Sequence, residues 1–223
     1  VLFDKAEAQY GPGQVIFQAM GDGNHSLATA KTAWENIKKT LSPEEIETHP
    51  ARYALCEIEN IHDDGIVFEP IHRVMFAKNG QSGDDILAET LELLNEQNGK
   101  AYTVASAEDV PEGAFQIPYM IGEKRGFVVV EDPSNKLEVG ALQNALDVMV
   151  KERKTCDIDY IHGTEAMIKL TAPEGRAGFM LPAMDKFMLF PAVAADGALP
   201  RKTFSMGEAN EKRYYIESRY IGK

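Results

Sequence analysis

The sequence predicts an α+β fold: a mixed sheet with antiparallel hairpins, and helices packed around it. Two observations lead to this fold class. Apolar residues recur at helical spacing in several stretches, and short apolar or alternating runs bounded by turn residues lie between them. The chain of 223 residues contains neither an internal repeat nor a low-complexity linker. We therefore expect a single α+β domain over 1–223 rather than two independent domains.

The N-terminal part of the chain is expected to run helix, strand, turn, helix. Weak helical spacing over 2–10 ends at a Gly-Pro-Gly sequence. An apolar run over 15–20 then predicts a strand, and a glycine-bearing turn follows over 21–26. Amphipathic spacing from Leu27 onward predicts a helix that carries Trp34 into the core.

A short helix and a hairpin are expected next. The Ser-Pro sequence at 42–43 is typical of a helix start, and this helix should end near 48–50. The partly alternating run 52–61 predicts a strand, and an Asp-Asp-Gly turn predicts a hairpin from that strand into 66–69. An apolar stretch over 70–76 follows directly.

The central part of the chain should form an outer helix followed by strands. The helix runs to about Asn98, and either Asp84 or Asp85 could cap its start. A hairpin is expected further on, and Pro118 favours an edge position for its first strand because proline cannot donate a ladder hydrogen bond. The strands predicted here are 101–105, 115–121 and 126–130.

The C-terminal part continues the alternation of helices and strands. A helix is expected over 140–154, and a strand over 157–162 leads to another helix for which Thr164 is a plausible cap. A short buried strand is expected at 178–181, followed by a helical stretch over 184–195. The last aromatic residues leave a closing strand and a closing helix equally open.

Composition disfavours nucleic-acid and membrane partners. The formal net charge is −12 and the sequence pI is about 4.9, so attraction to a polyphosphate backbone would need a concentrated basic patch. A nuclease or DNA binder is therefore a disfavoured third possibility. No apolar stretch reaches the length of a membrane helix; 177–188, for example, is interrupted by Pro182.

Cysteine usage points to a reducing compartment. Cys56 and Cys156 are the two cysteines, and neither belongs to a Cys-x-x-Cys or Cys/His cluster. This spacing favours reduced thiols in the cytoplasm over a disulfide framework or a zinc site, so no metal ligands are predicted. Each cysteine is expected to be a small buried hydrophobic residue.

The turn over 21–26 is the strongest candidate for chemistry. Gly21 and Gly23 allow backbone angles that expose consecutive N–H groups, and the helix that follows adds its own unpaired amides. Such a turn is suited to phosphate. The alternative is an ordinary β–α connection capped by Asn24 or Ser26.

The same residues resemble a family signature. The sequence Met-Gly-Asp-Gly-Asn-His-Ser at 20–26 looks like the Asp-Gly-His-His-Arg signature of the bacterial family known as domain of unknown function 1015. That family in turn resembles the ParB/sulfiredoxin superfamily, which includes free-serine kinases and CTP-binding ParB proteins and implies a similar turn and helix start around nucleotide phosphates. Asn24 replaces the usual first His and Ser26 the usual Arg, which removes a charged bidentate phosphate donor.

Three later elements extend the resemblance. Pro70, His72 and Arg73 match a Pro-x-His-Arg element, which by itself would suggest a surface strand end with a solvated Arg. His162 falls in a Tyr-x-His-Asp turn in which glycine replaces the acid, and by itself a lone histidine here would more often be bonded to a backbone carbonyl. A Pro-Arg-Lys-Thr sequence at 200–203 resembles a C-terminal Met-Pro-x-Lys-Ser-Thr element. Family members run longer, so the resemblance implies that 1–223 is the C-terminal portion of such a protein.

Together these elements imply a site for a phosphate-bearing small ligand. Asp22 and His25 could act as acid or base or position magnesium, and His72 is a third catalytic candidate. Arg73 and Lys202 would neutralise phosphate charge. The expected ligand-binding residues are Gly21, Gly23, Asn24, Ser26, Arg73, His162, Arg201, Lys202 and Thr203.

Two functions follow from this site. The first is an enzyme of the phosphotransferase or phosphatase type that acts on a small phosphorylated metabolite, with a nucleotide and magnesium as its cofactors. The second is a non-catalytic module that senses a nucleotide or binds a partner, which the altered charged positions of the signature favour.

Overall fold

The computed structural model describes residues 2–12, 16, 18–21, 23–133, 135–207 and 220–221. The chain divides into two compact units. Unit 1 consists of 1–15 and 68–205, and unit 2 of 16–67 and 206–223. The single domain over 1–223 stays a prediction, and each unit is described by itself.

Unit 1 is built on a six-stranded sheet. Its strands, in spatial order, are β3 (Lys100–Val104), β5 (Lys124–Glu131), β4 (Phe115–Ile121), β7 (Arg176–Phe179), β2 (His72–Ala77) and β6 (Cys156–Ile161). The α+β class and the β4–β5 hairpin are confirmed. Every pairing between neighbours in this sheet is antiparallel, so the sheet is not mixed. Each strand therefore runs in the direction opposite to the strands beside it, so no two neighbours need a parallel crossover connection.

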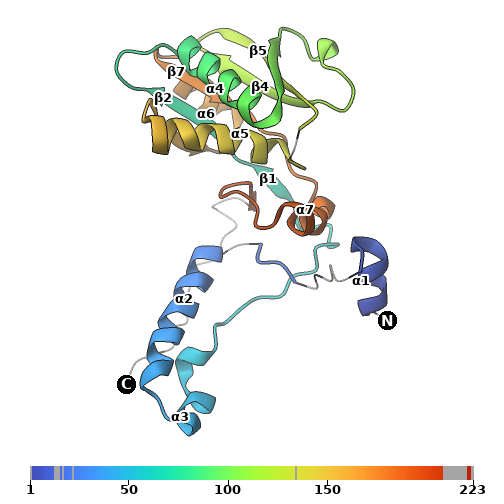
Figure 1. Ribbon diagram of the computed structural model, residues 1–223, viewed down its shortest axis with the longest axis vertical. Helices are drawn as coiled ribbons and strands as arrows, with labels where there is room; N and C mark the ends of the chain where they lie inside the picture. Colours follow the sequence, from blue (N-terminus) through green and yellow to red (C-terminus); the bar gives the residue numbers. More distant parts are fainter. Residues whose placement is uncertain are drawn as a thin grey trace. The chain divides into compact units, whose positions relative to one another are not determined.

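Helices bury both faces of this sheet. α4 (Gly83–Asn98) and α5 (Glu138–Asp147) lie over one face, and a π-helical stretch, Val148–Arg153, continues α5 (Figure 1). α6 (Thr164–Thr171) packs on the other face, where Met167 joins Val74 and Met120. Successive residues of β2 point to opposite faces, and both Val74 and Met75 are fully buried. The core of unit 1 therefore lies on both sides of the sheet.

The rest of unit 1 consists of short elements. Phe68 on β1 (Phe68–Pro70) stacks on Phe204 of β8 (Phe204–Met206), with ring centroids 4.0 Å apart, and the two strands form a second sheet. The predicted first helix is confirmed as α1 (Leu2–Tyr10). The remaining elements are the 3₁₀ turns Ala107–Asp109 and Lys186–Met188 and the helix α7 (Leu189–Asp196).

Two α-helices lie in the described residues of unit 2. α2 (Asn24–Ile37) continues into the 3₁₀ turn Lys38–Thr40, and α3 (Pro43–Thr48) is followed by the 3₁₀ turn Pro50–Arg52. The predicted start of α3 is confirmed, because Ser42 and Glu45 form a reciprocal capping box. α2 has no buried residue, so the placement of Trp34 in a core is wrong. Its ring is half-buried, with its centroid 5.9 Å from that of His49.

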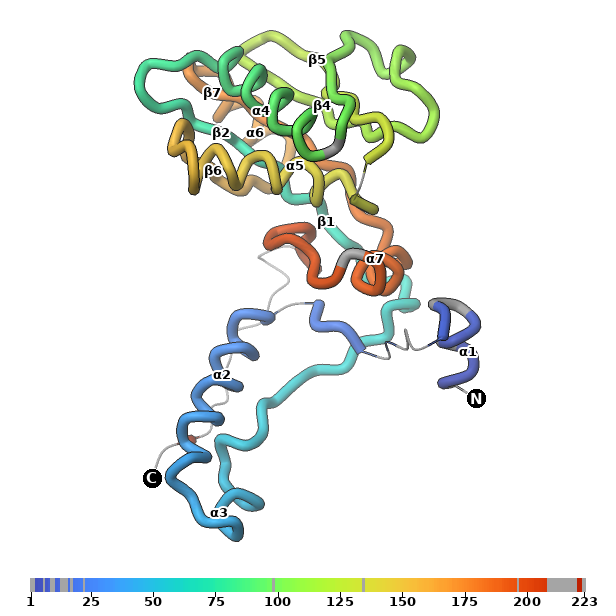
Figure 2. The backbone as a smooth tube through the Cα atoms, viewed as in Figure 1, coloured from blue at the N-terminus to red at the C-terminus, as the bar shows by residue number. Residues whose placement is uncertain are grey.

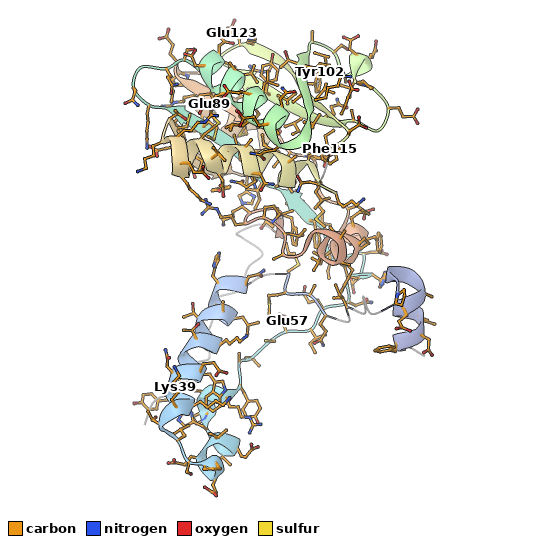
Figure 3. All side chains as sticks on the ribbon, viewed as in Figure 1. Lys39, Glu57, Glu89, Tyr102, Phe115 and Glu123 are labelled. Atoms are coloured by element: carbon orange, nitrogen blue, oxygen red, sulfur yellow. The ribbon has the colours of Figure 1, made fainter. Side chains whose placement is uncertain are left out.

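Two predicted strands are absent from the described part of unit 2. Residues 16 and 18–20 have no regular structure. The run 53–67 is an irregular stretch with Glu57 midway along it (Figures 2 and 3), so the predicted strand 52–61 and its hairpin are wrong. The side chain of Leu55 is 96% exposed. A strand needs a neighbouring strand to pair with, and the described residues of this unit supply none for this run.

Pro118 lies in the interior of the sheet, contrary to the prediction. β4 runs between β5 and β7, and the Pro118 carbonyl accepts a hydrogen bond of 2.8 Å from the Met180 N–H, just past the end of β7. The N and C=O of one residue face the same neighbour in an antiparallel ladder. The missing N–H therefore also faces Met180, so the ladder hydrogen bond that proline cannot make falls just past the end of β7 rather than within it.

Other local predictions also need correction. Ser82 rather than Asp84 or Asp85 is the N-cap of α4, and Gly163 rather than Thr164 precedes α6. Cys156 is buried as expected, but Cys56 is exposed. Most of the C-terminal segment, 208–219, lies outside the described residues.

Candidate functional site

The turn that carries the family-like signature ends in an uncapped helix start. α2 begins at Asn24, so Asn24, His25 and Ser26 occupy its first three positions. Gly23 is the N-cap with a φ of 76°, a left-handed angle that favours glycine, and as a glycine it offers no side chain to cap the helix. Capping by Asn24 or Ser26 is therefore not observed. The first amides of an α-helix have no partner within it, which keeps this end suited to an anion.

The turn also has a close neighbour. A side chain on Gly21 would place its Cβ 3.0 Å from the Met206 Cε atom, so a larger residue at this position would have to displace the flexible end of Met206. An apolar side chain thus covers one side of the turn. Asp22, a predicted catalytic residue, lies outside the described residues.

Arg73 on β2 is the most unusual side chain of unit 1, because it is charged and fully buried. Its Nε donates to Gln143 Oε1 at 3.0 Å, Nη1 donates to the Ile71 carbonyl, and Nη2 donates to the Arg201 carbonyl at 3.3 Å. The guanidinium lies over the ring of Tyr160, 5.0 Å from its centroid. The alternative of a solvated arginine is therefore wrong.

Burial shifts the titration of this guanidinium. The pKa of Arg73 is lowered to about 10, mainly by desolvation and also by the charge of Arg201, while Tyr160 and Asp147 act in the opposite direction. The cation at neutral pH is thus held in a protein interior by its hydrogen bonds and the Tyr160 ring. Its role as a phosphate ligand stays a prediction.

The segment that Arg73 contacts presents two cations. The Arg201 guanidinium lies 5.7 Å from the centroid of Tyr160, and its Nη2 is 3.8 Å from Asp147 Oδ1, beyond hydrogen-bond length. Lys202 is exposed and has a φ of 60°. Thr203 Oγ1 donates to the Pro200 carbonyl at 2.6 Å and closes the turn. Within the described part of the chain, the side chains of Arg201 and Lys202 make no hydrogen bond.

Gln143 on α5 connects these groups, and the sequence analysis missed it. Its Nε2 donates to Asp147 Oδ1 at 2.7 Å, and more weakly to the Tyr160 hydroxyl at 3.4 Å. Burial tends to raise the pKa of Asp147, but hydrogen bonds from Lys151 and Gln143 and the charge of Arg201 lower it overall. A polar residue within the apolar face of the predicted helix was the signal that could have revealed Gln143.

The two histidines of unit 1 lie near the same end of the sheet. His72 is 4% exposed, and its Nδ1 accepts a hydrogen bond of 3.2 Å from the Leu181 N–H. Burial lowers the pKa of His72, and the charges of Arg73 and His162 lower it further. His72 pairs with Ile161 across the β2–β6 ladder, which places the exposed His162 one residue beyond that pair. The catalytic role of His72 stays a prediction.

Two of the hollows in unit 1 include residues of this region in their linings. One, of about 190 Å³, is lined by Thr203 together with 137–139 and 181–185. A more open one, of about 520 Å³, includes Asp147 and Lys151 in its lining. Among the described residues, no three His, Cys, Asp or Glu side chains gather closely enough to hold a metal ion. No described helix combines the length and apolarity needed to span a bilayer.

The predicted site residues thus fall into two groups. Unit 1 brings Arg73 and Arg201 into contact, with Lys202 and Thr203 in the same turn and the two histidines at the neighbouring strand ends. Unit 2 holds the predicted residues of the turn before α2. A joint role for the two groups stays a prediction.

Comparison with known proteins gives a family and two similar structures. The sequence profile described as "Protein of unknown function (DUF1015)" matches residues 15–149. No curated protein matches the chain. A conserved hypothetical protein from Pyrococcus furiosus is 14% identical with a TM-score of 0.46, covering 69% of this chain and 61% of that one. A mutant free serine kinase in complex with AMP is 16% identical with a TM-score of 0.47, covering 68% and 58% respectively. The chain spans less than two thirds of either protein.

Proposed function

Starting from the membership of this chain in the DUF1015 family of proteins of unknown function, we propose that it binds a small phosphate-bearing ligand, either a nucleotide or a phosphorylated metabolite. One observation carries the proposal. The turn at 200–203 presents two cationic side chains whose donors make no hydrogen bond to any described residue, and the buried Arg73 holds the backbone of that turn through the Arg201 carbonyl. A planar guanidinium beside an ammonium group is suited to phosphate oxygens.

The uncapped start of α2 supports the same proposal from unit 2. Its first amides are oriented as phosphate donors, and Ser26 adds a hydroxyl there. Two further expectations belong to this proposal: the wider relationship to the ParB/sulfiredoxin superfamily and the cytoplasmic location.

For the reaction, we propose phosphotransferase or phosphatase-type chemistry, with a nucleotide and magnesium as cofactors. Asp22 and His25 would supply acid–base chemistry. The alternative is a non-catalytic module that senses a nucleotide or binds a partner. Two observations favour this alternative. Neutral residues, Asn24 and Ser26, stand where the signature carries charged ones, and the buried His72 already accepts a hydrogen bond from a backbone amide.

Ligand-dependent thermal denaturation tests the proposal. ADP, ATP and phosphoserine are each added with and without magnesium. A ligand at a hundred times its Kd stabilises the native state by about 2.7 kcal/mol, which raises Tm by roughly 5–10 °C for a chain of this size. The double variant Arg201→Gln, Lys202→Gln should lose most of that rise. A protein whose Tm responds to none of these compounds would contradict the proposal.

A matched control exists elsewhere in unit 1. Lys124 and Arg125 form another adjacent pair of exposed cations, at the β4–β5 hairpin. Lys124→Gln combined with Arg125→Gln removes the same charge and should leave the ligand response intact. Release of phosphate from ATP, or its transfer to an acceptor, then separates an enzyme from a sensing module, which would bind without turnover.

A further inference from the structure

The acceptors that hold Arg73 are all neutral. They are the amide oxygen of Gln143 and the backbone carbonyls of Ile71 and Arg201. A fully buried cation is normally paired with a carboxylate, because moving an isolated charge out of water is costly. Among the described residues, no carboxylate forms an ion pair with Arg73. Its positive charge therefore acts on its surroundings without compensation by a direct partner.

The chemistry of Gln143 explains why a neutral residue stands beside Arg73. The Nε of an arginine can only donate, and an ionised carboxylate can only accept. A glutamine satisfies both with its two different ends, Oε1 toward Arg73 and Nε2 toward Asp147. A glutamate would neutralise Arg73 but would place two carboxylates in contact. The amide thus joins a cation to an anion without adding charge.

Asp147 is the carboxylate that serves this whole cluster. It already bonds to Lys151, and it lies 3.8 Å from Arg201. Its charge also favours the protonated form of Arg73 and so opposes the lowering of the Arg73 pKa. Three cations therefore share one anion, and the exposed Lys202 follows Arg201 in the chain. Among the groups in direct contact with Arg73 and Arg201, positive charge therefore exceeds negative charge, and the carboxylates of Glu138, Glu152 and Asp185 line the neighbouring hollows.

We propose that this surplus makes the site at Arg201 and Lys202 select dianions, namely the terminal phosphate of a phosphate monoester, over monoanions of the same shape. Arg73 supplies the selectivity from the interior, and Gln143 maintains it by leaving Arg73 unneutralised. The inference rests on the proposed function, since it concerns the same ligand. In this role Arg73 and Gln143 do not touch the ligand.

The distances support an effect of this kind. Arg73 and Arg201 flank the same ring, with their guanidinium carbons 5.0 and 5.7 Å from its centroid. A buried charge is screened much less than an exposed one, so the field of Arg73 reaches a ligand bound by Arg201. That field acts twice as strongly on a dianion as on a monoanion.

Phenyl phosphate and phenyl sulfate form a suitable pair of probes, because they share one shape and differ in charge at neutral pH. Their affinities for the full chain are measured by isothermal titration calorimetry at pH 7.5. For the unmodified protein we expect phenyl phosphate to bind at least about tenfold more tightly. Gln143→Glu should reduce this ratio to about two- to threefold, because a glutamate there neutralises Arg73.

Asn144→Asp is the control for net charge. Asn144 is the next residue of α5 and is exposed, so this variant adds the same charge at a position where solvent screens it from Arg73. It should leave the tenfold ratio unchanged. If Arg73 only stabilises the fold, Gln143→Glu would instead change the affinities of both probes by the same factor, and the inference would be wrong.

The two proposals fail in different ways. If neither probe binds and ADP, ATP and phosphoserine also leave Tm unchanged, the proposed function is wrong. If both probes bind and Gln143→Glu keeps the ratio, only the dianion selectivity is wrong.

If Gln143→Glu does not fold, the affinity ratio of the two probes is measured on the unmodified protein over a series of pH values. Phosphate monoesters lose their second charge near pH 6, whereas the sulfate ester keeps its single charge. The ratio should therefore fall toward one between pH 7.5 and 5, and a constant ratio would overturn the inference. Other charged or titratable groups act on both probes, so they do not account for a change in the ratio. Those that face Arg73 are Tyr160 on β6, Asp147 on α5 and Arg201, and His72 lies beside it on β2.

Discussion

The Nη2 group of Arg73 donates a hydrogen bond to the carbonyl oxygen of Arg201 at 3.3 Å, between residues 128 positions apart in the chain. This bond fastens the turn at 200–203 to strand β2. It also unites two of the sequence elements that resemble the family signature. The basic side chains of that turn are therefore presented on a backbone anchored in the core of unit 1.

Replacement of Arg73 by lysine should destabilise unit 1 by about 3 kcal/mol. Lysine keeps the charge but cannot reproduce the three separate bonds of the guanidinium, so buried acceptors are left unsatisfied. Urea unfolding measures the change. Arg125→Lys on the exposed hairpin is the matched control and should change stability by less than about 0.5 kcal/mol. Equal effects of the two variants would show that the buried bonds contribute little.

Acidification should destabilise unit 1 through His72. Its folded-state pKa lies below the ordinary value of 6.5, so below pH 6.5 the unfolded chain binds a proton that the folded chain excludes. Stability then falls as pH drops below 6.5 and is unaffected by this group above it, with a limiting slope of about 1.4 kcal/mol per pH unit. His72→Asn retains an acceptor for the Leu181 N–H and should reduce this slope between pH 6.5 and 5. His162→Asn, which alters an exposed histidine, should leave most of the slope unchanged.

Substitution of Gly83 by alanine should cost about 2–3 kcal/mol. The added Cβ would collide with the Arg176 carbonyl oxygen and lie 2.5 Å from Ile121 Cγ2, so α4 would have to move away from the sheet. Gly80→Ala is the comparison: its Cβ meets nothing within 4 Å, but its φ is 76°. We expect a cost of about 1 kcal/mol there, from backbone strain alone. Thermal unfolding of both variants measures the two costs. A smaller loss of stability for Gly83→Ala than for Gly80→Ala would contradict the prediction.

The two cysteines should react with a thiol reagent at very different rates. Cys56 is exposed, whereas Cys156 is fully buried and burial raises its pKa. One thiol per chain should therefore be labelled rapidly in the native protein and both after denaturation. Cys56→Ser should remove the rapid phase, and its persistence in that variant would contradict the exposure described here.

Elements with strong local signals could be predicted from the sequence. The spacing over 84–98 predicts α4, and the runs around the Gly-Glu-Lys-Arg turn predict the β4–β5 hairpin, because periodicity and turn chemistry act between near neighbours. The strand prediction for 52–61 was wrong for the opposite reason. The composition of this run suits a strand, but pairing requires a partner that the sequence does not specify.

The candidate site shows the same division. The sequence by itself determined that Arg73, Arg201 and Lys202 are present and that the family-like signature lacks its arginine. The tertiary structure alone decided that Arg73 is buried, that its acceptors are neutral and that Gln143 separates it from Asp147. Desolvation and hydrogen bonding between distant segments depend on the packed arrangement of strands and helices, and no pattern of neighbouring residues encodes them.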